Sequence, residues 1–418
     1  MSRPIPIVSL IVFLTVQILF SQTLVSQSPI VLRDLTLIRG KTISKFDRSS
    51  IKLSDGSTLQ WDQVLKAELP DQSEGSDPSQ PQNQRQTEFD ALLKQIGLPM
   101  FRLKTRIQQG DWAGAGSIAE PIFDSAMAGT FTFPNPNVEY LVCLATMKSR
   151  AGQGSGARNR AGAVLPYLMA SSVQANVDRK TLELSGANRI AEEGDGISPE
   201  LLPVWFDIDQ VRASVEQIAK LNSKLRKSDS STSDNPLATA SKMTQRAFAI
   251  YLASMQIELG QNELANAILK RISGDQNQSV KTWSTVLRAR MFQKAENHVK
   301  AQAMLDSNSE SIIGDARPVA IYYRGLSDFE IRDTKLEEKP LNSVVDIELS
   351  KSSLMLMRLP AIYGESNPEI AAAGLYQVAK IAKLRGQAKQ SKKLLRELLQ
   401  RYPRTYHGSL EPAGIIAQ

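Results

Sequence analysis

The sequence predicts a mostly α-helical protein, an α-solenoid of helical hairpins preceded by a small N-terminal β module. Three observations support this fold class. Residues 371–403 read as two amphipathic helices joined at a glycine. Helical periodicity dominates from residue 87 to the end, whereas the alternation typical of strands is confined to residues 30–69. We therefore expect stacked hairpins to form most of the chain.

The clearest hairpin spans 371–403 (AAAGLYQVAKIAKLRGQAKQSKKLLRELLQRYP). Apolar residues recur at helical spacing before Gly386, as at Leu375, and after it, as at Leu398. Gly386 is suited to end the first helix and Pro403 to end the second. The stretch therefore predicts one complete helix–turn–helix unit.

This unit resembles a tetratricopeptide repeat (TPR), in which a glycine closes the first helix and a proline ends the second. Gly386, Ser391 and Pro403 occupy the family's glycine, small-residue and proline positions. The packing positions of the first helix carry Leu375, Val378 and Ala379, without the usual aromatic residue.

Two weaker matches precede this unit. Gly260 is followed by Ala265 but by no closing proline, and Gly110 is followed by a proline, Pro121, inside the second helix. The three glycines lie 150 and 126 residues apart, which is no fixed period. The resemblance implies either a degenerate solenoid with insertions or a helical bundle with the same turn chemistry. A solenoid would present a concave surface that binds a peptide or a protein.

The N-terminal residues 1–27 are predicted to form a signal peptide or an N-terminal anchor. Arg3 precedes a mainly apolar stretch from Ile5 to Phe20, and polar residues follow. The alternative is an uncleaved anchor, because Ile5–Val25 is long enough to cross a bilayer. Either interpretation places the body outside the cytoplasm, in the periplasm or the extracellular space.

Residues 28–69 are predicted to form a small β module of three or four strands. Asp55-Gly56 separates two alternating runs, a strong hairpin signal in which both central residues would need positive φ. Trp61 is expected to pack the module against the helical body. Residues 70–86 contain no apolar residue except proline, which predicts a disordered polar linker.

Residues 87–418 are predicted to form the helical-repeat domain, with a polar loop at 227–235 that would divide it. Proline follows a capping residue at Ser198-Pro199 and Asn367-Pro368, so each pair is expected to begin a helix. The expected helices are 88–109, 112–128, 137–151, 158–175, 178–193, 199–226, 237–259, 262–273, 279–296, 299–307, 316–332, 344–358, 368–385 and 388–402.

The sequence offers little for nucleophilic or metal chemistry. Cys143 is the single cysteine, which excludes an intrachain disulfide, and its apolar surroundings predict a buried structural thiol. His298 and His407 are the only histidines, and both are expected at the surface. We therefore predict no catalytic residue, no cofactor-binding residue and no metal ligand.

Paired carboxylates are the remaining catalytic option. Trp205 and Phe206 adjoin Asp207 and Asp209, and aromatic residues beside acids suit a carbohydrate hydrolase. The competing interpretation places both aromatic residues in the core of a helix and both acids in solvent. The second interpretation is favoured, and the protein is predicted not to be an enzyme.

Basic residues concentrate in the last repeat. Residues 371–404 carry nine basic side chains and one acid, a net charge of +8 against +7 for the whole chain. Such a face suits an acidic partner or an anionic surface, although a solvated outer face is the favoured interpretation. The candidate interaction residues are Lys383, Arg385, Lys389, Lys392, Lys393 and Arg396.

These observations predict an exported, non-enzymatic scaffold of the cell envelope that binds a protein or peptide through its helical surface. The first alternative is a binder of anionic envelope polymer or membrane surface through the basic last repeat. The second is a helical hydrolase that uses carboxylates. No nucleic acid is expected as a partner, because few aromatic residues interleave with the basic cluster.

Overall fold

The computed structural model describes residues 29–70, 82–153, 160–185, 194–228, 242–336 and 343–410. The predicted signal or anchor at 1–27 lies outside these ranges, as does most of the predicted dividing loop at 227–235. Within them, no helix combines the length and apolar character needed to span a membrane. The chain divides into two compact units, Met1–Thr105 and Arg106–Gln418.

The first unit contains two small antiparallel sheets of three strands each, with strand orders β2-β1-β6 and β3-β4-β5. The β4–β5 turn contains Asp55-Gly56 as expected, but only Gly56 has positive φ, at +82°. Leu53 and Ser57 close a three-residue loop, so the glycine alone takes the left-handed position. The strands are β1 (Ile30–Leu32), β2 (Leu37–Ile38), β3 (Ile43–Phe46), β4 (Ile51–Leu53), β5 (Thr58–Leu59) and β6 (Val64–Lys66).

Trp61 anchors these strands to helix α2 (Gln82–Leu92), since its ring lies 5.2 Å from that of Phe89 and its Nε1 donates to Asp47 O. The helix begins six residues before the expected position 88. Its early start is explained by Gln86, whose side chain accepts from Leu69 N and donates to Ala67 O. The last five residues of the predicted 70–86 linker are therefore helical. A π-helical turn (Leu93–Gly97) leads into α3 (Leu98–Gln108).

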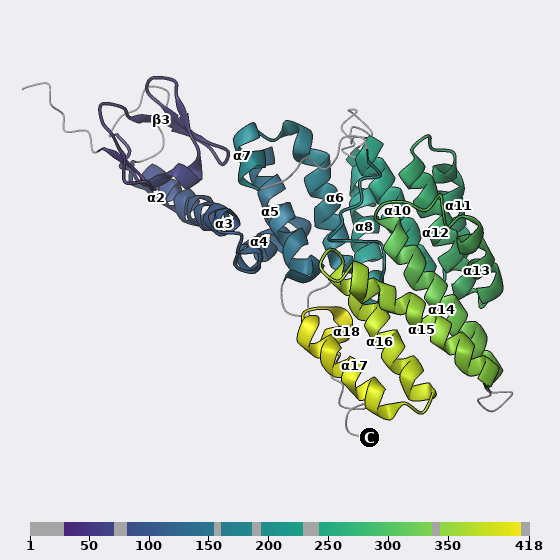
Figure 1. Cartoon of the computed structure of the whole chain (residues 1–418). Coiled ribbons are helices and arrows are strands. Elements are labelled where there is room, and N and C mark those ends of the chain that lie inside the picture. Colours follow the sequence, from purple (N-terminus) through teal and green to yellow (C-terminus); the bar gives the residue numbers. More distant parts are fainter. Residues whose placement is uncertain are drawn as a thin grey trace, which may run out of the picture. The chain divides into compact units, whose positions relative to one another are not determined.

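The helices of the second unit pack as neighbours in chain order, and Figure 1 shows the run from α10 to α17. The first helices of successive hairpins, α10, α12, α14 and α16, also pack on one another and form an inner layer. The bounds are α4 (Trp112–Met127), α5 (Pro136–Lys148), α6 (Val164–Val173), α7 (Arg179–Leu184), α8 (Ile208–Ser228), α10 (Lys242–Glu258), α11 (Asn262–Ser273), α12 (Gln278–Lys294), α13 (His298–Ser307), α14 (Ala316–Leu336), α15 (Ser343–Ile362), α16 (Pro368–Leu384), α17 (Ala388–Arg401) and α18 (Tyr406–Ser409). Shorter helical turns are Ser149–Gln153, Ala161–Ala163 and Gln174–Asn176.

One turn geometry recurs where helices meet, at Gly110, Gly260, Glu296 and Gly386. At each position the residue has φ between +59° and +75°. Its amide donates to the carbonyl three residues back, and the next amide donates to the carbonyl five residues back. The chain is therefore a helical-repeat structure. The turn at Glu296 was not predicted from the sequence, because it contains no glycine. The residues five positions after the four turns are all buried: Ala115, Ala265, Ala301 and Ser391.

The predicted helix at 199–226 is wrong at its start, because residues 194–207 are irregular and α8 begins at Ile208. Pro203 lacks the amide that a helix begun at Pro199 would need at its fifth position. Asp207 caps α8 instead, since its Oδ1 accepts from the amides of Asp209 and Gln210. By contrast, α16 begins at Pro368 as predicted, although the Asn367 side chain makes no capping hydrogen bond.

Candidate functional site

The irregular segment 194–207 crosses the inner layer of helices. Trp205 Nε1 donates to Ser254 Oγ on α10 at 2.8 Å. Trp283 Nε1 on α12 donates to Asp195 Oδ2 at 2.7 Å. Leu201, Leu202 and Val204 are buried. The chain itself thus covers part of the inner surface where a concave peptide-binding groove was expected.

The same segment decides the surroundings of the acids considered for hydrolysis. Trp205 is buried, as the competing interpretation expected, but in an irregular segment rather than a helix. Asp207 caps α8, and Asp209 forms an exposed ion pair with Arg212 at 2.8 Å. Both carboxylates therefore have structural partners on α8.

His407 lies in an aromatic cluster, and its predicted surface position is wrong. Its ring lies 4.6 Å from Phe206 and 4.9 Å from Tyr376, and its side chain is 6% exposed. Thr405 caps the one-turn helix α18 that folds the histidine inward. Burial lowers the pKa of His407 to about 3, helped by the charge of Lys380.

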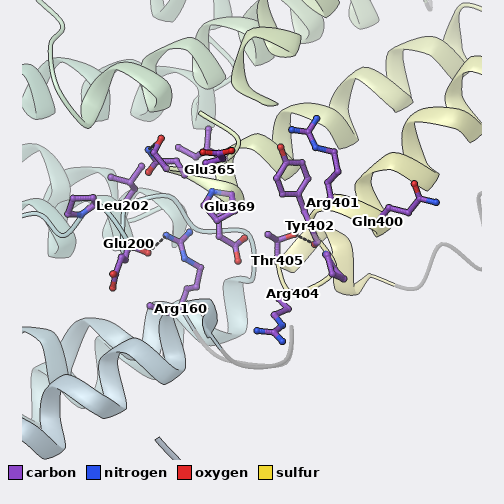
Figure 2. A pocket seen from close by; sticks show the side chains of 17 residues that line it. Arg160, Glu200, Leu202, Glu365, Glu369, Gln400, Arg401, Tyr402, Arg404 and Thr405 are labelled. Atoms are coloured by element: carbon purple, nitrogen blue, oxygen red, sulfur yellow. Dashed lines mark hydrogen bonds between the residues drawn. The ribbon is translucent and has the colours of Figure 1, made fainter. Parts of the chain in front are cut away.

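A cavity of about 660 Å³ opens between four segments of the second unit (Figure 2). Arg160 contributes one wall and residues 199–202 the next. The third wall is the loop 365–367 with the start of α16, and the fourth is formed by residues 400–405 at the end of α17. The volume falls within the range of about 300–1,000 Å³ that is usual for ligand sites.

Four polar atoms of residues in these walls are buried without a hydrogen-bond partner among the residues that the structure describes. They are Nε and Nη1 of Arg160, Oδ1 of Asn367 and the hydroxyl of Tyr402. The three side chains are 9%, 7% and 5% exposed, respectively. More than about 90% of buried polar groups in folded proteins are hydrogen-bonded, and each that is not costs roughly 1–3 kcal/mol. These atoms are themselves covered by protein, so it is the size and lining of the cavity that mark it as the candidate binding site.

Arg160 is the charged centre of this site. Figure 2 shows its guanidinium between Glu200 and Glu369, and Nη2 donates to the backbone carbonyl of Glu200 at 3.3 Å. Burial lowers the pKa of Arg160, and the charge of Glu369 opposes this effect. The guanidinium nevertheless remains protonated, because its ordinary pKa is far above neutral.

Glu369 does not neutralise Arg160 at short range, since no ion pair of 4 Å or less joins these two described residues. Burial raises the pKa of Glu369, while the Arg160 charge and a hydrogen bond from Tyr406 N at 3.2 Å lower it. Burial outweighs attraction for both groups. The pair is therefore undercompensated, and a further polar partner would stabilise it.

Two of the charged residues at the rim, Arg401 and Glu200, have ion-pair partners. Arg401 pairs with Glu397 at 3.0 Å and lies over the Tyr402 ring at 5.3 Å. Glu200 pairs with Lys148 at 3.0 Å. Arg160, by contrast, is buried and has the Glu200 carbonyl as its hydrogen-bond acceptor.

The predicted basic face lies elsewhere, on the end of α16 and the outer side of α17. Its residues do not line the cavity, and the leucines of α17 face inward as expected. Four of the residues are exposed and two half-buried: Lys383, Lys389, Lys393 and Arg396, and Arg385 and Lys392. The sequence analysis did not single out Arg160, which lies near the start of the expected helix 158–175.

Cys143 is buried as predicted, and burial raises the pKa of its thiol. Across the ranges that the structure describes, no group of three or more His, Cys, Asp or Glu side chains is placed to hold a metal ion.

No protein-family model matches the chain, and no curated protein matches it. Among solved structures, a human IFIT1 dimer with m7Gppp-AAAA aligns at 13% identity and a TM-score of 0.35. The alignment covers 76% of this chain and 63% of that chain, so this chain spans less than two thirds of the human protein. A similarity this distant does not bear on what this chain binds.

Proposed function

We propose that this protein is a non-enzymatic helical-repeat scaffold that binds a protein or peptide partner. The single observation that carries the proposal is the cavity of about 660 Å³ that opens beside α16 and α17 in a helical-repeat fold. A concave site of this size, lined by both charged and apolar side chains, is typical of binding sites. The recurring turns and buried small residues support a TPR-like assignment for the scaffold.

The binding surface differs from the one expected from the repeat alone. Residues 194–207 already cover part of the inner layer, so we place the partner at the cavity beside α16 and α17. Export to the cell envelope remains part of the proposal and rests on the signal-like pattern of residues 1–27.

Site-specific photo-cross-linking in cells tests the proposal. A photoreactive amino acid replaces Gln400 or Glu365, two exposed residues that line the cavity. The matched controls replace Leu264 on α11 or Val299 on α13, both exposed. We expect one protein to be captured from both cavity positions and from neither control. Equal capture from all four positions, or none from any, would contradict the proposal.

A second candidate function is binding to an anionic surface. It is favoured by the outer side of α17, where Lys389, Lys393 and Arg396 are exposed and the helix's one acid, Glu397, pairs with Arg401. Reversal of the three basic residues to Glu should then abolish binding to vesicles of anionic lipid. Binding by the unchanged protein should weaken steeply with salt, because exposed charges are screened. Vesicle binding that ignores both changes would remove this candidate.

A further inference from the structure

A row of exposed side chains runs along one side of α15. Ile347, Leu354 and Ile362 are apolar, and they are 56%, 69% and 58% exposed, respectively. Lys351 and Arg358 lie between them in the same row and are also exposed. These five residues form the α15 stripe. Scattered apolar residues are normal on a protein surface, but an aligned set of them indicates an interaction site.

The spacing of the α15 stripe is that of a seam between two helices. Its members follow one another at intervals of four, three, four and four residues, so they face the same way along the helix. Two helices pack against each other through such rows of residues three and four apart. The row is roughly 22 Å long, at about 1.5 Å per residue. An α-helix of a partner therefore matches the whole length of the stripe.

A groove of about 150 Å³ lies beside the stripe. It is lined by the end of α13, the loop that follows it, the start of α14, and Met355 and Arg358 of α15. Among these residues, Ile321 and Met355 are half-buried and offer apolar surface. The groove is smaller than the range of about 300–1,000 Å³ that is usual for small-molecule sites. It suits a single apolar side chain of a helix that lies on the stripe.

The unpaired charges of this surface are positive. Asp306, the one acid that lines the groove, is held by Arg324 through two hydrogen bonds of 2.6 and 3.0 Å. Arg317 and Arg358 also line the groove, and both are exposed. Across the described part of the chain, no ion pair joins Arg317, Arg358 or Lys351 to an acid. The surface therefore complements acidic side chains.

Two other occupants fit this surface less well. A second copy of the chain, docked about a two-fold axis, would bring Lys351 and Arg358 against the same cations of its partner, and like charges repel. A lipid bilayer would contact Leu354, but its flat surface would not fill the groove beside the stripe. A helix uses the stripe, the groove and the charges together.

We infer that α15 docks an acidic amphipathic helix of a partner protein. The helix packs along the α15 stripe, inserts one apolar side chain into the groove, and presents Asp or Glu to Lys351, Arg358 and Arg317. No residue of the stripe lines the cavity beside α16 and α17. The stripe is therefore a second interaction surface, and the two proposals are tested separately.

Selection from a displayed peptide library on the full-length protein tests this inference. The peptides are amphipathic helices of three heptads, with leucine at positions a and d and random residues at positions e and g. We expect Asp and Glu to be enriched at least fivefold over Lys and Arg at positions e and g. A selected pool without this preference would overturn the inference.

Charge reversal assigns the preference to α15. Lys351→Glu combined with Arg358→Glu should reverse it, so that Lys and Arg are enriched instead. The matched control is Lys389→Glu combined with Arg396→Glu on α17, two exposed cations with the same seven-residue spacing. This control should keep the preference for acids. An unchanged preference in the α15 variant, or a reversed one in the control, would refute the assignment.

Leu354→Glu tests the apolar part of the contact. The side chain is largely exposed, so the variant should fold, which circular dichroism checks. It should weaken binding of a selected acidic helix at least tenfold. The matched control Leu264→Glu, on α11 at a position that is 56% exposed, should leave binding unchanged. Equal affinity of the two variants for the helix would contradict docking on α15.

The two other occupants have their own measurements. Vesicles of phosphatidylcholine with one quarter phosphatidylserine report membrane binding, and analytical ultracentrifugation of the protein alone reports self-association. We expect the unchanged protein and Leu354→Glu to behave alike in both measurements. Vesicle binding or self-association that Leu354→Glu abolishes, together with a peptide pool that shows no preference for acids, would assign the surface to a membrane or to a second copy and overturn the inference.

Discussion

Replacement of Gly260 by alanine tests whether the recurring turn is what holds the repeats together. Gly260 joins α10 to α11 with φ of +74°, and its amide donates to Ile257 O. A Cβ atom built at this position meets no atom within 4 Å. Any loss of stability in Gly260→Ala must therefore come from the backbone conformation and not from crowding.

The expected magnitude follows from two opposing effects. A left-handed conformation costs an ordinary L-residue about 1–2 kcal/mol. Alanine, however, lowers the conformational entropy of the unfolded chain relative to glycine, which stabilises the folded state by about 0.4–1 kcal/mol. We expect Gly260→Ala to lower the free energy of unfolding by about 1 kcal/mol. Glu296→Gly, at the same turn between α12 and α13, should raise it slightly, because Glu296 holds φ of +59° with a side chain attached.

Gly274 provides the matched control at the other end of α11. Its φ is −82°, and a Cβ there would lie 3.7 Å from Arg271 O, an ordinary contact. Gly274→Ala should therefore be neutral or stabilising by up to about 1 kcal/mol. Urea denaturation followed by circular dichroism measures all three variants, with hydrogen exchange at α10–α13 to localise the effect. Equal midpoints for the alanine variants of Gly260 and Gly274 would refute the turn argument.

Two further predictions concern buried titratable groups. Burial lowers the pKa of His407 to about 3 in the folded chain, against about 6.5 when unfolded, so its contribution to stability is fully present above pH 6.5 and is lost as pH falls below it. Between pH 6.5 and 5 the free energy of unfolding should therefore drop by about 2 kcal/mol, at ~1.4 kcal/mol per pH unit. Urea titrations at several pH values should show that His407→Gln removes this dependence and that the control His298→Gln keeps it. An equal pH dependence in both variants would contradict the assignment to His407. Cys143 is buried, and burial raises the pKa of its thiol. The thiol should therefore resist alkylation by iodoacetamide in the native protein and react in urea. Rapid alkylation of the native protein would contradict this prediction.

The sequence predicted the features that follow from local periodicity. The hairpin at 371–403 forms with Gly386 at its turn, because amphipathic spacing and a left-handed glycine are local properties. The burial of Cys143 followed from its apolar neighbours in the same way. The helical-repeat fold class could therefore be deduced from the residues alone.

Features that depend on tertiary contacts could not be deduced. Glu296 adopts a glycine-like conformation because the flanking helices α12 and α13 fix it, and nothing in its own chemistry signals that. His407 is buried by Phe206 and Tyr376, which lie 201 and 31 residues away in the chain. Periodicity describes how one helix meets its neighbours and does not reveal what a one-turn helix folds against.

The candidate site lies where the chain departs from the repeat pattern. Arg160 stands just before a short helical turn, Asn367 heads a helix without capping it, and Tyr402 ends one with its hydroxyl unpaired. Each departure leaves a buried polar atom whose desolvation is uncompensated within the chain. The basic residues of α17 carry more charge, but water satisfies them, and exposed pairs contribute little. The cavity differs because it is a concave site of about 660 Å³ and not a solvated helix face. That difference is the physical reason to place recognition at the cavity and not on the more conspicuous basic face.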